Sequence, residues 1–112
     1  MVASQISHNC TQLRWLGISS REVTENSLRD ISNLVYLEHL VLSGCSSIKD
    51  FTQLRFPPKL SVLDVSKSPH LTDGQLLSWE PANLVSLNLD DCKLTDLALQ
   101  FIAKKCNKLG MF

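Results

Sequence analysis

Residues 85–96 read VSLNLDDCKLTD, residues 62–73 read VLDVSKSPHLTD and residues 39–50 read HLVLSGCSSIKD. The three stretches share one pattern, in which apolar residues two positions apart are followed by a polar turn, another apolar residue and a polar pair ending in Asp. An alternation with a period of two is typical of a strand with one buried face. The chain therefore repeats one strand-and-turn unit, and this repetition decides the fold.

The same unit extends over nearly the whole chain. Apolar residues of the form LxxLxL recur, and the first residues of successive sets are 24, 23, 24 and 25 positions apart. The sets are Leu13-Leu16-Ile18, Leu37-Leu40-Leu42, Leu60-Leu63-Val65, Leu84-Leu87-Leu89 and an incomplete fifth at Leu109 and Phe112. One unit cannot bury its own leucines, but stacked units can. We therefore predict one parallel sheet, formed in chain order with helices on one side only, by residues 14–18, 38–42, 61–65 and 85–89.

Each strand is expected to lead into a helix. A second apolar residue follows the LxxLxL set, and a polar pair comes next, at residues 24–25, 49–50, 72–73 and 95–96. Side-chain oxygens of Thr and Asp suit a helix start, because they accept hydrogen bonds from its free backbone N–H groups. Proline and glycine within the two middle units should keep their helices short. These residues are Pro57, Pro58, Gly74 and Pro81.

Cys45 and Cys92 occupy the same turn position, each three residues after the last apolar residue of its set. The matching residues are Arg21 in the first unit and Ser68 in the third. At such a turn, a small polar side chain pointing inward can supply the hydrogen bonds that nearby buried backbone groups need. The repeat therefore predicts a structural role for these cysteines.

The cysteines are predicted to carry reduced thiols. Cys10 and Cys106 share a second register, each three residues before the first leucine of a set. With strands ~4.8 Å apart, Cys45 and Cys92 lie two units and roughly 10 Å apart, beyond the ~7 Å limit for a disulfide. The chain has neither a CxxC motif nor a Cys–His cluster with zinc spacing. We therefore expect no metal, and four thiols suit an intracellular protein.

The composition argues against nucleic-acid and membrane partners. The 112 residues hold 11 Lys plus Arg and 11 Asp plus Glu, so the formal net charge is zero, and both signs are mixed along the chain. A basic stripe that neutralises phosphates is therefore not expected. The N-terminal residues lack the pattern of a secretory signal, and no stretch approaches the ~18 apolar residues of a membrane helix. We expect a cytoplasmic or nuclear protein.

Together these features resemble the leucine-rich repeat of the cysteine-containing type. The match is carried by the turn cysteine, the following Leu-Thr-Asp, a helix ending in AKKCNKL at residues 103–109 and a period near 25. The resemblance implies an α/β solenoid, a horseshoe segment with parallel strands on its concave face and short helices on its convex face. It implies a single domain over residues 1–112, with about four repeats starting near residues 13, 37, 60 and 84 and a truncated fifth at 109. Because the chain begins and stops inside repeats, we expect a fragment of a longer protein.

The function is an expectation from the same resemblance. This repeat type is best known from F-box proteins, whose repeats hold a substrate while the F-box binds the adaptor of a cullin–RING ubiquitin ligase. A protein–protein interaction module is therefore expected, with substrate recognition for an F-box-like, SCF-type ubiquitin ligase as its role. These residues do not match an F-box, so a ligase adaptor would be reached only through a module outside them. The alternative is a structural or assembly factor with similar repeats, of the mitochondrial type and without a ubiquitin role.

Strand side chains that alternate with the buried leucines should point to solvent and form the binding surface. Three columns across the sheet are expected. They are Trp15-His39-Val62-Ser86, Gly17-Val41-Asp64-Asn88 and Ser19-Ser43-Ser66-Asp90. The predicted protein-binding residues are Trp15, His39, Val41, Asp64, Asn88 and Asp90. Trp79, in contrast, is expected to pack a return loop on the convex side.

No catalytic or cofactor site is predicted. A Ser or Cys nucleophile needs a histidine within hydrogen-bond reach, and His8, His39 and His70 fall at different repeat positions. His39 should point away from the core, whereas Cys45 should point into it. The chain has only four glycines, and they form no phosphate-binding loop. We therefore expect a binding protein and not an enzyme.

Overall fold

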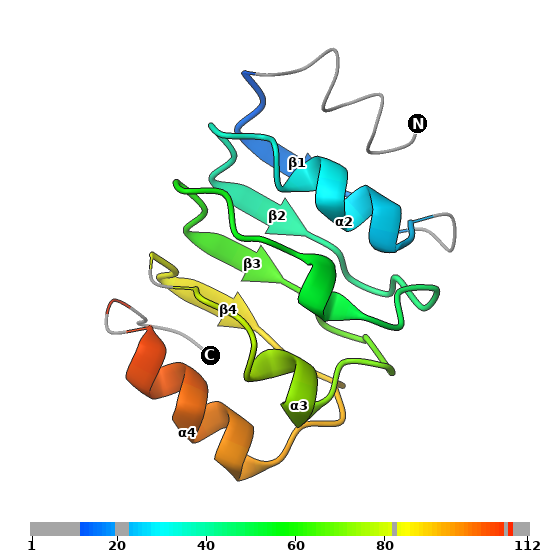
Figure 1. Ribbon diagram of the computed structural model, residues 1–112, viewed down its shortest axis with the longest axis vertical. Coiled ribbons are helices and arrows are strands. Elements are labelled where there is room, and N and C mark those ends of the chain that lie inside the picture. Colours follow the sequence, from blue (N-terminus) through cyan, green and yellow to red (C-terminus); the bar gives the residue numbers. More distant parts are fainter. Residues whose placement is uncertain (1–11, 20–22, 82, 107, 109–112) are drawn as a thin grey trace.

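The computed structural model describes residues 12–19, 23–81, 83–106 and 108. Within them, a four-stranded sheet forms one layer and helical segments form a second layer (Figure 1). In chain order the elements are β1 (Trp15–Gly17), α2 (Glu25–Ile31), β2 (His39–Val41), the 3-10 helix η1 (Phe51–Gln53), β3 (Val62–Asp64), α3 (Asp73–Leu76), β4 (Ser86–Asn88) and α4 (Asp96–Lys105). Each strand is thus followed by one helical segment.

The four strands pair in parallel and in chain order, β1-β2-β3-β4, which confirms the predicted sheet. The register aligns the leucines across all four strands in a single row. This row is Leu16, Leu40, Leu63 and Leu87. Backbone hydrogen bonds extend the pairing beyond the assigned strands, as from Ile18 N to Val41 O at 2.8 Å. The regular spacing of the apolar sets explains this register, because a slip of one residue would expose the whole row.

One apolar core lies between the sheet and the helices. The leucine row packs with residues from every helical segment, including Leu28 of α2, Phe51 of η1, Leu76 of α3 and Ile102 of α4. In Figure 1 these segments lie side by side, in the same order as the strands that precede them. The helices therefore cover the leucine side of the sheet, as predicted, and no described helix lies on the other side.

The lengths of the helical segments follow from their sequences. The two outer helices have 7 and 10 residues, whereas η1 has 3 and α3 has 4. The residues after η1 lead into Pro57-Pro58, which cannot continue a helix. α3 contains Gly74 and ends before Pro81. The prediction of two short middle helices is confirmed.

The helix starts are where predicted, but two of their hydrogen bonds differ from the prediction. Thr72 and Thr95 precede α3 and α4 as N-cap residues, yet neither side chain bonds within its own helix. Instead, the carboxylate of Asp73 accepts hydrogen bonds from the backbone N–H of Thr95, at 3.0 Å, and from its hydroxyl. Glu25 likewise accepts from the backbone N–H of Lys49 at 3.1 Å. Acidic residues of one unit therefore satisfy the free N–H groups of the next unit.

Each turn after β2, β3 and β4 contains one residue in the left-handed region. Gly44 has a φ of 72°, Lys67 of 56° and Asp91 of 58°. These residues directly precede the turn positions 45, 68 and 92, so the backbone bends in the same way in each unit. The N–H groups of Gly44 and Lys67 donate to Ser66 O at 3.0 Å and Asp90 O at 2.8 Å, linking each turn to the next. The left-handed residue thereby aims the following side chain at the core.

Candidate functional site

The candidate site is the side of the sheet that no described helix covers, here called the open face. The register places its side chains in the predicted columns, with Trp15 beside His39, Val62 and Ser86. The second column likewise aligns Gly17, Val41, Asp64 and Asn88. In these two columns the residues of β1 are exposed, and those of β3 and β4 are partly exposed. The structure thus brings the predicted strand residues together on one surface.

Trp15 and Gly17 form one structural feature. The indole of Trp15 is 59% exposed. It lies so close to Gly17 that an added Cβ there would meet the ring at 2.6 Å. Because Gly17 has no side chain, the indole of Trp15 can lie along the strand and cover the position two residues further on. The sequence shows both residues in adjacent columns, but not that the ring covers the glycine.

Asp64 and Asn88 stabilise the turns as well as lining the open face. The Asp64 carboxylate accepts a hydrogen bond from the Ser66 N–H at 2.8 Å, and the Asn88 side chain accepts from the Asp90 N–H at 3.0 Å. The Asn88 amide also donates to the Asp64 carboxylate at 3.4 Å. This local pairing is typical of Asp and Asn at the end of a strand. The expectation that these side chains only face solvent is therefore incomplete.

The third column is only partly a surface. Ser19 and Asp90 are exposed and Ser43 is half-buried, whereas Ser66 is buried. The hydroxyl oxygens of Ser43 and Ser66 lie 3.0 Å apart and share a hydrogen bond. The expectation of an outward-pointing column is thus wrong at Ser66. The bend after each strand is the physical reason, because it turns this position toward the neighbouring unit.

The turn cysteines point inward, as predicted. Cys45 is fully buried, and its thiol donates to Ile18 O at 3.5 Å. Cys92 is half-buried, and its thiol donates to Val65 O at 3.3 Å. Burial raises the pKa of the Cys92 thiol, and the nearby charges of Asp91, Asp64 and Asp90 add to the rise. Both thiols therefore link neighbouring units, and the raised pKa makes Cys92 a poor nucleophile.

Ser68 takes the same turn position in the third unit. Its side chain is completely buried, and its hydroxyl has no hydrogen-bond partner in the described part of the chain. The corresponding carbonyl in the preceding unit belongs to Leu42. A C–O bond is shorter than a C–S bond, which accounts for a hydroxyl without a partner at the position where Cys45 and Cys92 donate to a carbonyl.

Cys106 and Trp79 both belong to the core. The thiol of Cys106 donates to Pro81 O at 3.2 Å, and burial raises its pKa. Trp79 is 1% exposed, and its indole N–H donates to Phe51 O at 3.0 Å. Its ring meets Phe51 and Phe56 edge-on, with centroids 6.5 and 5.2 Å away. The prediction that Trp79 packs beneath a return loop is confirmed.

The described residues contain no group of three or more His, Cys, Asp or Glu placed to hold a metal ion. Two carboxyl groups have shifted pKa values, and both serve helix starts. Hydrogen bonds from the Thr52 side chain and backbone lower the pKa of Asp50, and those from Thr95 lower the pKa of Asp73. These shifts are accounted for by capping, without acid–base chemistry.

Some predicted features lie outside the described residues. They are His8, Cys10, Arg21, Leu109 and Phe112. Where the structure describes the chain, Cys45, Cys92 and Cys106 form no disulfide. None of its described helices has the length and apolar character needed to cross a bilayer.

Comparison with known proteins adds no identification. No protein-family model matches the chain, and no curated protein matches it significantly.

Proposed function

We propose that the chain is a segment of a leucine-rich-repeat solenoid of the cysteine-containing type, and that its open face is the concave surface that binds a protein partner. Repeat proteins commonly bind through such extended surfaces. The proposal is supported by the register, since a unit of 23 or 24 residues aligns four strands and three turns that each contain a residue with positive φ. The inward thiols of Cys45 and Cys92 support the cysteine-containing type.

The exposure of Trp15 beside His39 is the observation that carries the binding role. Trp15 holds a large apolar ring in solvent on the open face, although the same chain buries Trp79 almost completely. Tryptophan is enriched among the residues that dominate protein interfaces, because it buries a large rigid area at little cost in conformational entropy. Val41 lies on the neighbouring strand and extends the apolar part of this face toward Asp64 and Asn88.

The partner class in this proposal comes from the resemblance to F-box proteins. The open face would hold the substrate of an F-box-like ubiquitin ligase, and Asp90 would lie at its acidic end. The ligase adaptor would bind an F-box outside these 112 residues. The chemistry of ubiquitin transfer would then belong to other subunits, and this segment would bind and orient.

Photocrosslinking tests the position of the binding face. A photoreactive amino acid at His39 should crosslink a partner in cells, and Trp15→Ala should reduce that crosslinking by about tenfold, the loss typical of an interface anchor. The matched control carries the photoreactive residue at Val35, which is 50% exposed in the loop between α2 and β2. Equal crosslinking from both positions would contradict the proposal.

The ubiquitin role needs a second measurement. A captured substrate should accumulate, and lose its ubiquitin conjugates, when the free segment competes with the full-length receptor. If a partner is crosslinked at His39 but its abundance and its ubiquitin conjugates do not change under this competition, the binding role stands and the ligase role is excluded. Asp64→Ala is unsuitable for testing binding. The Asp64 carboxylate accepts a hydrogen bond from the Ser66 N–H, so its removal would also lower the stability of the fold.

A further inference from the structure

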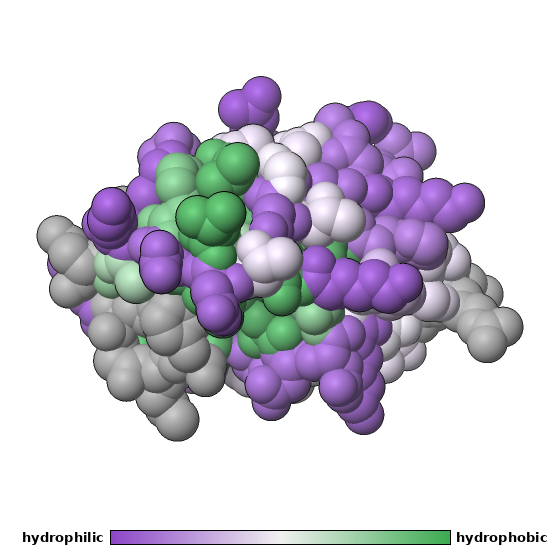
Figure 2. Space-filling model, turned by 90° about the horizontal axis from the view of Figure 1, so that it is seen from below, coloured by the Kyte–Doolittle hydropathy of each residue, from purple (hydrophilic) through white to green (hydrophobic). Residues whose placement is uncertain are grey.

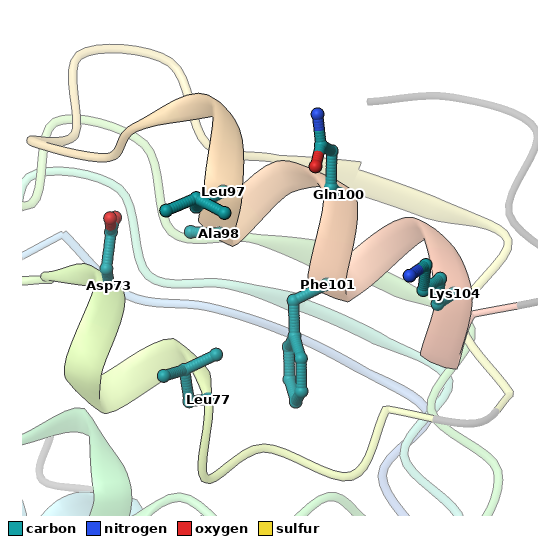
Figure 3. A pocket seen from close by; sticks show the side chains of 7 residues that line it. All are labelled: Asp73, Leu77, Leu97, Ala98, Gln100, Phe101 and Lys104. Carbon is teal, nitrogen blue, oxygen red and sulfur yellow. The ribbon is translucent and has the colours of Figure 1, made fainter.

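A second surface lies away from the open face, in the groove between α3 and α4. The groove has a volume of about 360 Å³ and is lined by Asp73, Leu77, Leu97, Ala98, Gln100, Phe101 and Lys104 (Figure 3). Leu97 is 76% exposed and Leu77 is 49% exposed. Figure 2, which views the molecule from below and toward the α4 end, shows apolar side chains gathered on this side with hydrophilic residues around them. Such a bordered apolar patch is typical of an interaction site.

The repeat provides an internal comparison for this groove. The corresponding groove between α2 and η1 is lined entirely by polar and charged residues. They are Arg29, Ser32, Asn33, Thr52, Gln53 and Arg55. A groove between neighbouring helices therefore does not need apolar walls in this fold. The leucines and phenylalanine between α3 and α4 therefore distinguish this groove from the one between α2 and η1.

The α3–α4 groove has opposite charges at its two ends. In Figure 3, Asp73 lies near the start of α4 and Lys104 near its end, with Leu77 and Phe101 between them. Lys105 forms an ion pair with Glu80 at 2.7 Å, whereas Lys104 has no ion pair within the described residues. Leu97, Phe101 and Lys104 follow the spacing i, i+4, i+7 and so share one stripe of the helix.

We propose that α4 of a second copy of this chain packs antiparallel against α4 in this groove. A two-fold axis makes each copy supply the same surface to the other. Antiparallel packing would place Lys104, at the end of α4 in one copy, beside Asp73, near the start of α4 in the other copy. The two-fold axis would form this charge pair two times. It would also place Gln100, near the middle of the helix, close to its counterpart at the axis. The groove is thus complementary to itself in both charge and apolar character.

The proposed dimer is small and therefore weak. One pair of short helices buries less than the ~1,600 Å² of a standard interface, so we expect dissociation in the micromolar range or above. The interaction is independent of the open face, and neither result from the photocrosslinking test would decide it.

Sedimentation equilibrium over a concentration series tests the dimer. Leu97→Gln should raise the dissociation constant at least about tenfold, because Leu97 is the most exposed apolar residue of the interface. Val35→Gln is the matched control, because it removes a 50% exposed aliphatic side chain from a different surface. Thermal melts should show both variants folded. A chain that is monomeric at all concentrations, or a dimer unaffected by Leu97→Gln, would overturn the proposal.

Disulfide trapping tests the two-fold arrangement. Gln100→Cys should form a homodimeric disulfide under mild oxidation, because the two introduced thiols would lie near the axis. Asn33→Cys, which is exposed in the loop after α2, should not crosslink above the level of the unchanged chain. Crosslinking from both positions would indicate random collision, and crosslinking from Asn33 alone would place the contact elsewhere; either result refutes this geometry.

Discussion

The thiol of Cys92 donates a hydrogen bond to the carbonyl oxygen of Val65, 3.3 Å away in the preceding unit. Cys45 makes the same contact with Ile18 at 3.5 Å. Between them, Ser68 occupies the same position with a buried hydroxyl that has no partner in the described part of the chain. Of the three equivalent turn positions, Cys45 and Cys92 each form a hydrogen bond to the preceding unit, whereas the hydroxyl of Ser68 forms none within the described residues.

Ser68→Cys should increase the free energy of unfolding by about 1 kcal/mol, because it replaces a buried hydroxyl without a partner by a thiol that reaches Leu42 O. Urea denaturation measures the change. Ser68→Ala is the control, since it removes the hydroxyl without adding a link, and it should stabilise less than Ser68→Cys. A cysteine variant less stable than the alanine variant would show that the site does not accept sulfur.

Lys67→Gly should raise the free energy of unfolding by roughly 0.5 kcal/mol. Lys67 has a φ of 56°, where a side chain is strained, and the relief slightly exceeds the entropy that glycine loses on folding. Lys93→Gly, at an exposed position without positive φ, should instead destabilise. Chemical denaturation of the two variants should give shifts of opposite sign, and equal shifts would contradict the argument.

Asp73→Asn should destabilise the protein at neutral pH and make its stability less sensitive to acid. Hydrogen bonds from the Thr95 side chain and backbone lower the pKa of Asp73 in the folded state. A lowered pKa contributes stability that is present above the unfolded pKa and is lost as the pH falls through the folded pKa. The stability curves of parent and variant should therefore converge below about pH 4, the unfolded Asp pKa.

Asp96→Asn is the matched control for this measurement. Asp96 takes the same first-turn position in α4, but no described residue of a following unit donates to it. Thermal melts from pH 7 to pH 2 should show a smaller change for Asp96→Asn than for Asp73→Asn. Equal changes would mean that the link between units contributes nothing beyond the ordinary helix-start effect.

The thiols should be reduced and slow to react in the folded protein. Titration under denaturing, non-reducing conditions should count four thiols, including Cys10. In the native state, alkylation of Cys92 and Cys106 at pH 8 should be slower than after denaturation, because burial raises both pKa values and limits access. Two or fewer thiols in the denatured chain would instead reveal a disulfide.

The sequence was sufficient for the sheet and the core, because both depend on a period that every unit repeats. Leu16, Leu40, Leu63 and Leu87 align only if the strands pair in order, so their spacing predicts the register. The contacts between units could not be predicted in the same way. Whether Asp73 reaches Thr95, or whether the Ser68 hydroxyl finds a partner, depends on the distance between stacked backbones.

The candidate site shows the same division. Alternation along the strands was enough to place Trp15, His39 and Val41 on one surface. It did not reveal that Gly17 accommodates the Trp15 ring, that Asp64 and Asn88 hold the turns, or that Ser66 is buried. These features depend on the bend after each strand, which arises from positive φ angles that the sequence signals only at Gly44.

The different exposure of the two tryptophans allows intrinsic fluorescence to report separately on the core and on the open face. Trp79 is 1% exposed and Trp15 is 59% exposed, so their fluorescence should emit at shorter and longer wavelengths respectively. Loss of the short-wavelength component would report melting of the core, while a blue shift of the long-wavelength component would report that a ligand has covered the open face. A chain retaining only Trp15 would therefore allow binding to be titrated without any attached dye.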